Sequence, residues 1–179
     1  HDALPISMLV QAVSIAFVMC VCELVSAPVM VSAVGGAFAL MPWFLVACLF
    51  AVAFVYTVGF VLLWAADSFA ARLKRRDALM PLIYAVIGCV GFGIWGYCVY
   101  PATMNSIITR AGLTTLSQGD SLMIGINCAV VGLAAFFLGT AAMPRVMKSK
   151  GRIAVTAAAV IALAVFGGVV LAMTWSHLA

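Results

Sequence analysis

Long apolar runs dominate the chain, and short polar segments separate them. Five runs are candidate transmembrane helices, and they cover about 8–25, 42–71, 79–99, 121–143 and 153–175. An apolar stretch of about 18 or more residues can cross the hydrocarbon core of a bilayer as an α-helix. None of these runs alternates polar and apolar residues, as the strands of a membrane barrel do. The pattern therefore predicts an all-α fold, a polytopic transmembrane helix bundle of about five spans.

Two of the connections between the spans carry signals of their own. Pro28 is expected to end the first span, because proline lacks the amide hydrogen and clashes with the preceding turn. The short apolar stretch 29–40 then reads as an outer loop or a partly inserted segment. In 102–111, apolar residues recur at helical spacing, which predicts an amphipathic helix on the membrane surface. Asp120 or Ser121 is expected to cap the fourth span.

Composition and charge support this reading and add an orientation. The chain is 67% apolar and 8% charged, whereas soluble domains carry about 25% charged residues. Eight of the nine Lys and Arg residues fall in two loops, 72–77 and 145–152, and the ninth is Arg110. The positive-inside rule places both loops in the cytoplasm of a bacterial inner membrane, with the C-terminus outside. Because the net charge of +4 is explained by these loops, nucleic acid is not an expected partner.

The start of the chain leaves several readings open. The first residue is His1, and we expect residues 1–179 to be a single transmembrane domain from a longer protein. Alternatively, Met8 is the natural start and 1–7 is a foreign leader. A signal peptide ending near Ala27 is a third reading, although the positive n-region of such peptides is missing.

The fourth span has the clearest internal pattern, a row of small residues at alternating spacings of four and three. The row consists of Ser121, Gly125, Cys128, Gly132, Ala135, Gly139 and Ala142. Helices in lipid associate through close backbone approach and van der Waals contact, because the hydrophobic effect does not drive them together. This row therefore predicts a helix-packing seam, either within the bundle or against another subunit.

Glu23 is the one acidic residue that lies clearly within an apolar run. A carboxylate in hydrocarbon is costly, so such residues mark a function or lie near the headgroups. Glu23 falls near the outer end of the first span, which favours an acid at the membrane interface. The functional alternative is proton relay, ion binding or quinone contact, and it makes Glu23 the candidate catalytic residue.

Several kinds of chemistry have no residues to support them in this sequence. The only histidines are His1 and His177, whereas a membrane haem b needs axial histidines on facing helices. The six cysteines include no CxxC pair, and buried free cysteines usually act as small apolar residues. Metalloprotease, nucleotide-binding and nucleophile-elbow motifs are also missing. We therefore expect no bound cofactor and no metal site.

The order and spacing of the spans resemble those of a known family. A helix leaves the cytoplasm, an outer connection follows (Ser26-Ala27-Pro28 to Gly35-Gly36), and then come two hairpins with basic inner tips. In this layout the chain resembles the last five helices of the dimethyl sulfoxide reductase membrane anchor subunit family. The final helix departs from that family, because Gly167–Leu171 lacks an expected basic residue. No functional residue is carried over.

The resemblance implies an anchor that oxidises a quinol such as menaquinol and holds iron–sulfur and molybdopterin subunits. A small-solute permease, or a fragment of one, is the alternative, because transporters use interrupted helices near charged residues as binding sites. A purely structural membrane protein is a third reading. Whether the chain is part of an enzyme is left open at this stage.

Overall fold

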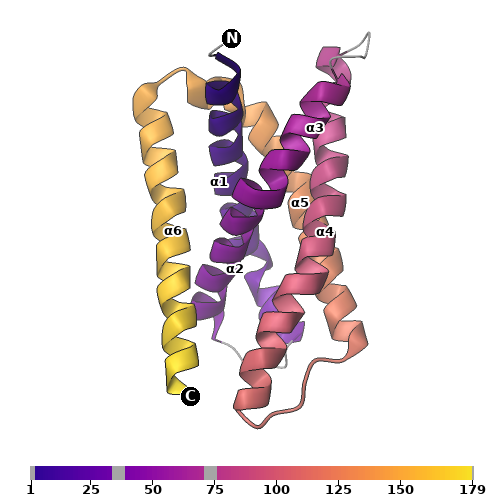
Figure 1. Ribbon diagram of the computed structural model, residues 1–179, viewed down its shortest axis with the longest axis vertical. Coiled ribbons are helices and arrows are strands. Elements are labelled where there is room, and N and C mark those ends of the chain that lie inside the picture. Colours follow the sequence, from indigo (N-terminus) through magenta and orange to yellow (C-terminus); the bar gives the residue numbers. More distant parts are fainter. Residues whose placement is uncertain (1–2, 34–38, 71–75, 179) are drawn as a thin grey trace.

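The computed structural model describes residues 3–33, 39–70 and 76–178, and every element within these ranges is helical (Figure 1). In chain order the elements are α1 (Ala3–Ala33), α2 (Leu40–Phe54), the π-helical turn η1 (Val55–Gly59), α3 (Phe60–Ala70), α4 (Arg76–Arg110), α5 (Gln118–Met147) and α6 (Lys150–His177). Because α2, η1 and α3 follow one another directly, they form one long helix with a π turn in it. The prediction of an all-α fold is confirmed.

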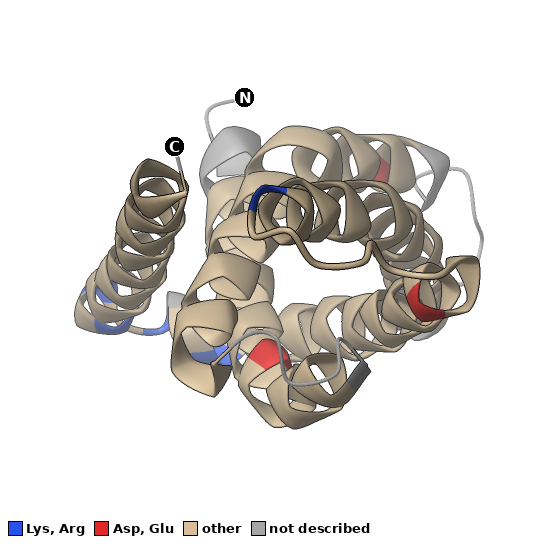
Figure 2. Cartoon of the chain, turned by 90° about the horizontal axis from the view of Figure 1, so that it is seen from below, with Lys and Arg blue, Asp and Glu red and all other residues tan. Residues whose placement is uncertain are grey.

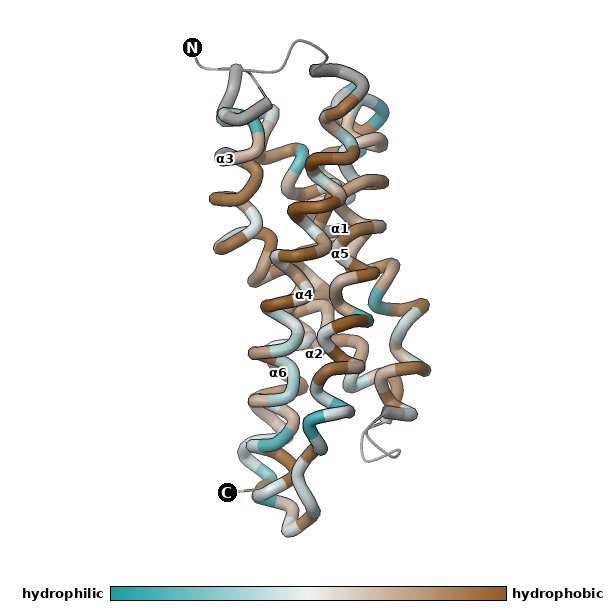
Figure 3. Tube along the Cα trace, turned by 90° about the vertical axis from the view of Figure 1, so that its right-hand side faces the viewer, coloured by the Kyte–Doolittle hydropathy of each residue, from teal (hydrophilic) through white to brown (hydrophobic). Residues whose placement is uncertain are grey.

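Among the described residues, five helical segments are long and apolar enough to cross a membrane. They cover Ser7–Ser32, Leu40–Ser68, Leu79–Arg110, Gln118–Val146 and Lys150–His177. Hydrophobic residues are found along all of these helices (Figure 3). Each helix satisfies its own backbone hydrogen bonds, which is what a chain in lipid requires. The chain is therefore an integral membrane protein with several spans.

The helices pack as a bundle in which neighbours in sequence are not always neighbours in space. The most extensive contacts join α4 to α5, and α1 lies against both α5 and α2. The C-terminal helix α6 packs mainly on α2, at the side of the bundle (Figure 1). Three aromatic rings fill the centre, where Phe54 contacts Phe92 and Phe136 at centroid distances of 5.1 and 6.2 Å. These contacts hold α2, α4 and α5 around one core.

The first helix does not end at Pro28, as the sequence led us to expect. α1 continues through this proline to Ala33, so the first part of the stretch 29–40 is helical. A proline removes one backbone hydrogen bond, whereas ending the helix inside lipid would leave several backbone groups unsatisfied. The prediction that Pro28 ends this helix was therefore wrong, and the reading of 29–40 as an outer loop or a partly inserted segment stays a prediction. Residues 34–38 lie outside the described residues.

The predicted surface helix at 102–111 is also wrong. α4 runs without interruption through Pro101 to Arg110, and its apolar stripe faces the protein core. Within this stretch Met104 is fully buried, and Ile108 is nearly so. The periodicity was real, but it marked a protein-facing side of a longer helix. α4 ends at Arg110, and two residues later Gly112 has a φ of 71°, which favours glycine.

Ser117, and not Asp120 or Ser121, is the N-cap of α5. Its hydroxyl oxygen accepts a hydrogen bond from the backbone N–H of Asp120 at 3.1 Å. The Asp120 carboxylate in turn accepts from the backbone N–H of Ser117 at 3.1 Å, which completes a capping box. The preceding loop is fixed by Leu116, whose N–H donates to the Asn105 side chain at 2.8 Å. These bonds set where α5 begins.

The connection between α5 and α6 lies at the same end of the bundle as the last residues of α3 and the first residues of α4 (Figure 1). Basic residues of the stretch 145–152 are therefore gathered at that end. Of the first basic loop, residues 71–75 lie outside the described residues. Charged residues are few along the rest of the bundle when it is viewed from the opposite end (Figure 2). The cytoplasmic orientation of both loops stays a prediction.

Candidate functional site

Glu23 lies in the interior of the bundle, and its side chain is fully buried. The hydroxyl of Tyr100 donates a hydrogen bond to Oε1 of Glu23 at 2.8 Å. The second carboxyl oxygen, Oε2, is buried and has no hydrogen-bond partner within the part of the chain that the structure describes. The structure thus places this carboxyl between helices, and its predicted position near the headgroups stays a prediction.

Tyr100 joins three helices at this point. It comes from α4 and is itself fully buried, and its hydroxyl also lies 3.3 Å from the backbone carbonyl oxygen of Ala47 in α2. A hydroxyl has one hydrogen to donate and lone pairs to accept with. When Glu23 is ionised, Tyr100 donates to the carboxylate. When Glu23 is protonated on Oε1, it can donate to Tyr100, which then donates to Ala47.

This geometry allows a proton to be added to or removed from Glu23 through a rotation of one hydroxyl group. Three aromatic rings surround Tyr100 and exclude water from the pair. The centroid of the Tyr100 ring is 5.8 Å from Trp43, 5.1 Å from Phe50 and 6.2 Å from Phe92. A buried carboxyl with so few partners is costly, and inside a membrane protein it is by default a functional hypothesis.

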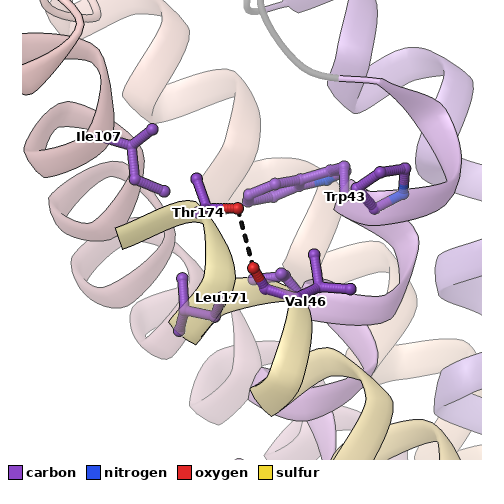
Figure 4. Close-up of a pocket in the computed structure, with 7 residues that line it drawn as sticks. Trp43, Val46, Ile107, Leu171 and Thr174 are labelled. Carbon is purple, nitrogen blue, oxygen red and sulfur yellow. Dashed lines mark hydrogen bonds between the residues drawn. The ribbon is translucent and has the colours of Figure 1, made fainter. Parts of the chain in front are cut away.

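A small cavity is lined in part by Trp43, whose ring also contacts that of Tyr100. It is lined by α2, α4 and α6 through Pro42, Trp43, Val46, Ile107, Val170, Leu171 and Thr174, and Figure 4 shows these side chains. Its volume of about 30 Å³ matches a single water molecule. The one hydroxyl in its lining, on Thr174, donates to the carbonyl of Val170 at 2.8 Å. The cavity is thus small and largely apolar.

A second carboxyl–tyrosine pair lies toward the other end of α4. The hydroxyl of Tyr84 donates to Oδ1 of Asp67 in α3 at 2.8 Å. Tyr84 is buried and Asp67 is half-buried. The two pairs have the same donor and acceptor types, but only the Glu23 carboxyl is sealed from solvent. Asp67 therefore provides a natural comparison for Glu23.

The small residues predicted as a packing seam lie along two neighbours of α5. They are Ser121, Gly125, Cys128, Gly132, Ala135, Gly139 and Ala142. Gly132 lies against Gly88 of α4, so closely that a methyl group on Gly88 would come within 2.5 Å of the Gly132 carbonyl oxygen. Farther along, Gly139 lies against Ile15 of α1. The row thus contacts α4 at Gly132 and α1 at Gly139.

Sequence reasoning named Glu23 but missed its partner. Tyr100 is 77 residues away in the chain, and no spacing rule relates a residue in one helix to a residue in a helix that is not its neighbour. One weak signal existed in α4, where Tyr84, Phe92 and Tyr100 recur every eight residues. Each step of eight turns the helix by about 80°, so the three rings follow a strip that winds around α4, and all three are buried.

Comparison of the chain with protein-family models, with curated proteins and with solved structures gives no match. The class of the protein therefore rests on its own features. These are five apolar helices packed as a bundle, with one carboxyl buried between them.

Proposed function

We propose that the chain is a haem-free membrane anchor subunit that oxidises quinol and holds peripheral redox subunits, with Glu23 as the proton acceptor. The observation that carries the proposal is the buried Glu23–Tyr100 pair, in which Oε1 is held at 2.8 Å and Oε2 has no partner among the described residues. Oxidation of a quinol releases two protons and two electrons, so it requires a base near the quinol hydroxyl groups.

Each residue has a distinct role in this proposal. Oε2 of Glu23 receives the proton, and Tyr100 holds the carboxyl in place through Oε1. The Tyr100 hydroxyl, which lies within hydrogen-bond distance of both Glu23 and the Ala47 carbonyl oxygen, keeps the helices in contact in either protonation state of the carboxyl. The electrons pass to the iron–sulfur and molybdopterin subunits that the anchor holds. Glu23 is fully buried, so quinol reaches it only when the helices around it move apart.

The partner part of the proposal is tested by purifying the full-length tagged protein from native membranes in mild detergent. Mass spectrometry of the purified material is expected to identify iron–sulfur and molybdopterin subunits. Recovery of the protein alone, or with an ATPase or a solute-binding protein, would contradict the anchor role and move the work to solute uptake.

The chemical part is tested by Glu23→Gln, with Asp67→Asn as the matched control. Both changes turn a carboxyl into an amide beside a tyrosine of α4, but only the first removes the buried base. General acid–base catalysis contributes about 10²–10⁴-fold, so we expect Glu23→Gln to lower quinol oxidation by about 100-fold or more at unchanged membrane yield. Asp67→Asn should stay within a few-fold of wild type. Equal activity of the two variants would refute the role of Glu23.

One observation favours a second candidate, a proton-coupled transporter. The π-helical turn η1 interrupts the helix in the middle of the second span, and π turns occur often at functional sites. Proteoliposomes containing a pH-sensitive dye distinguish the two functions. A solute-dependent proton flux that Glu23→Gln abolishes would establish the transporter. A protein that lacks both activities would be a structural membrane component.

A further inference from the structure

The π turn η1 divides the second span into two halves that the bundle holds to different degrees. In α2, eight of the fifteen residues are buried, including Phe54 at its end. In the stretch 60–68 of α3, by contrast, Leu63 and Ala66 are buried and the other residues are exposed or half-buried. The first half of the span is therefore embedded in the core, whereas the second half lies at its edge, beside α4 (Figure 1).

The turn η1 itself has features that favour bending. The hydroxyl of Thr57 donates to the backbone carbonyl oxygen of Ala53 at 2.6 Å. Side-chain bonds of this kind often bend helices, and they satisfy backbone groups that an irregular turn frees in lipid. Thr57 and Val58 are exposed, so the turn is packed on its inner side, at Val55 and Gly59. π turns of this type occur often at functional sites.

An apolar groove separates the second half of the span from α4. Its volume is about 470 Å³, and it is lined by Val58 and Leu62 on one side and by Val86, Ile87, Val90, Gly91 and Ile94 of α4 on the other. A methyl group on Gly91 would lie 2.7 Å from Cδ1 of Leu62 and 3.2 Å from Cζ of Phe54. Leu62 and Phe54 thus meet α4 at the same place. Movement of α3 away from α4 would widen the groove there and uncover the Phe54 ring.

Beyond the groove, a hydrogen bond ties the last part of α3 to α4. The hydroxyl of Tyr84, which is buried, donates to Oδ1 of Asp67 at 2.8 Å. Asp67 lies eight residues after Gly59, which is about 12 Å along a helix. A bond at that distance from η1 restrains bending at the turn far better than a bond close to it.

We propose that α3 is an arm that swings about η1, away from α4, and that the Tyr84–Asp67 hydrogen bond is the latch that holds it. A few residues at the end of an element can absorb the backbone change of such a hinge. The swing opens the bundle sideways to the bilayer at Phe54. This inference does not depend on the proposed function, because the arm would move equally in an anchor or a transporter.

The test measures distances between pairs of nitroxide spin labels by pulsed electron paramagnetic resonance on the full chain in lipid nanodiscs. The labels are attached to p-acetylphenylalanine, so that the six native cysteines stay in place. The arm pair joins Ser68 on α3 to Leu133 on α5, and the control pair joins Met41 on α2 to the same Leu133. All three side chains are exposed. Ser68 lies about 14 Å from Gly59 along the helix, so a swing of about 20°, the size of a sharp kink, moves it by about 5 Å.

Tyr84→Phe and Asp67→Ala each remove the latch, and Tyr97→Phe is the matched control, since it changes an exposed tyrosine of the same helix. Both latch variants are expected to add a population in which the arm-pair distance is about 5 Å longer. The control pair, and both pairs in Tyr97→Phe, are expected to keep the wild-type distances. The double latch variant should shift no further than either single one, because the two changes break one bond.

Each part of the proposal has its own contrary result. Unchanged arm-pair distances in both latch variants would overturn the arm. An equal shift of the control pair would show that the whole span moves, which would overturn η1 as the hinge. A shift in only one latch variant, an additive shift in the double variant, or a similar shift in Tyr97→Phe would overturn the Tyr84–Asp67 bond as the latch.

Discussion

Replacing Gly132 with alanine should destabilise the bundle by forcing α4 and α5 apart. A methyl group on Gly132 would lie 2.8 Å from the Gly88 carbonyl carbon and 2.8 Å from Cβ of Phe92. Carbon atoms in ordinary contact are about 3.5–4.0 Å apart. The two helices must therefore separate by roughly 1 Å, or their backbones must bend, along the most extensive contact in the bundle.

The size of the effect can be worked out against a matched control. Overpacking of a tight core costs about 1–3 kcal/mol, while alanine gains up to about 1 kcal/mol over glycine in helix propensity. Gly168→Ala on α6 gains the same propensity, but a methyl group there meets no atom within 4 Å. The free energy of unfolding of the two variants should thus differ by about 1–3 kcal/mol, with Gly132→Ala the less stable.

The difference is measured by titrating both variants and the wild type with SDS in mixed micelles and following unfolding by circular dichroism. We expect Gly132→Ala to unfold at a lower SDS fraction and Gly168→Ala at or above the wild-type value. Val131, the neighbour of Gly132 in the sequence, would be a poor control position for a substitution, because its side chain is itself buried. Equal midpoints for the two glycine variants would show that close approach at Gly132 does not limit stability, and the packing seam would have to be abandoned.

Three further predictions follow from the ends of the helices. Ser117→Ala should cost about 1 kcal/mol of stability through loss of the capping box, whereas Ser149→Ala at the start of α6, which makes no side-chain cap bond, should cost little in the same titration. Arg110→Gln should cost about 0.5–1 kcal/mol, because the Arg110 guanidinium lies 5.0 Å from the centroid of the Trp175 ring; an unchanged midpoint would refute a stabilising contact. Alkaline phosphatase fused after Ala179 should be active and a fluorescent protein there dark, and the reverse result would invert the proposed orientation.

The number and type of the spans could be predicted because lipid imposes a simple rule. A backbone in hydrocarbon must satisfy its own hydrogen bonds, so a long apolar run without charges has one solution, a helix. The same rule explains where the sequence reading failed. Pro28 and Pro101 each lie inside a helix, because their neighbours hold the helix together. Rules for proline learned in water overstate its power to end a membrane helix.

Of the two residues in the candidate site, the sequence predicted Glu23 and not Tyr100. The apolar run around Glu23 indicated a costly carboxyl, but whether Glu23 is buried within the bundle depends on which helices cover it. α1 is covered by α2 and α5, and no feature of α1 alone specifies those neighbours. Position along the helix was therefore a poor guide to burial. Tyr100 could not be assigned for the same reason, since its role depends on tertiary contacts and not on its local sequence.

One strip of residues on α4 connects the packing of the bundle to the candidate site. Along this strip, which winds around the helix by about 40° at each step, large and small residues alternate every four positions, as Tyr84, Gly88, Phe92, Gly96 and Tyr100. The two glycines admit α5 to close contact, and the aromatic residues between them fill the core or hold carboxyl groups. Close approach at Gly96 therefore helps to set the position of Tyr100, one turn farther along the helix. The seam and the Glu23 pair are thus parts of one arrangement, so the proposed proton acceptor depends on contacts made by residues that carry no chemistry.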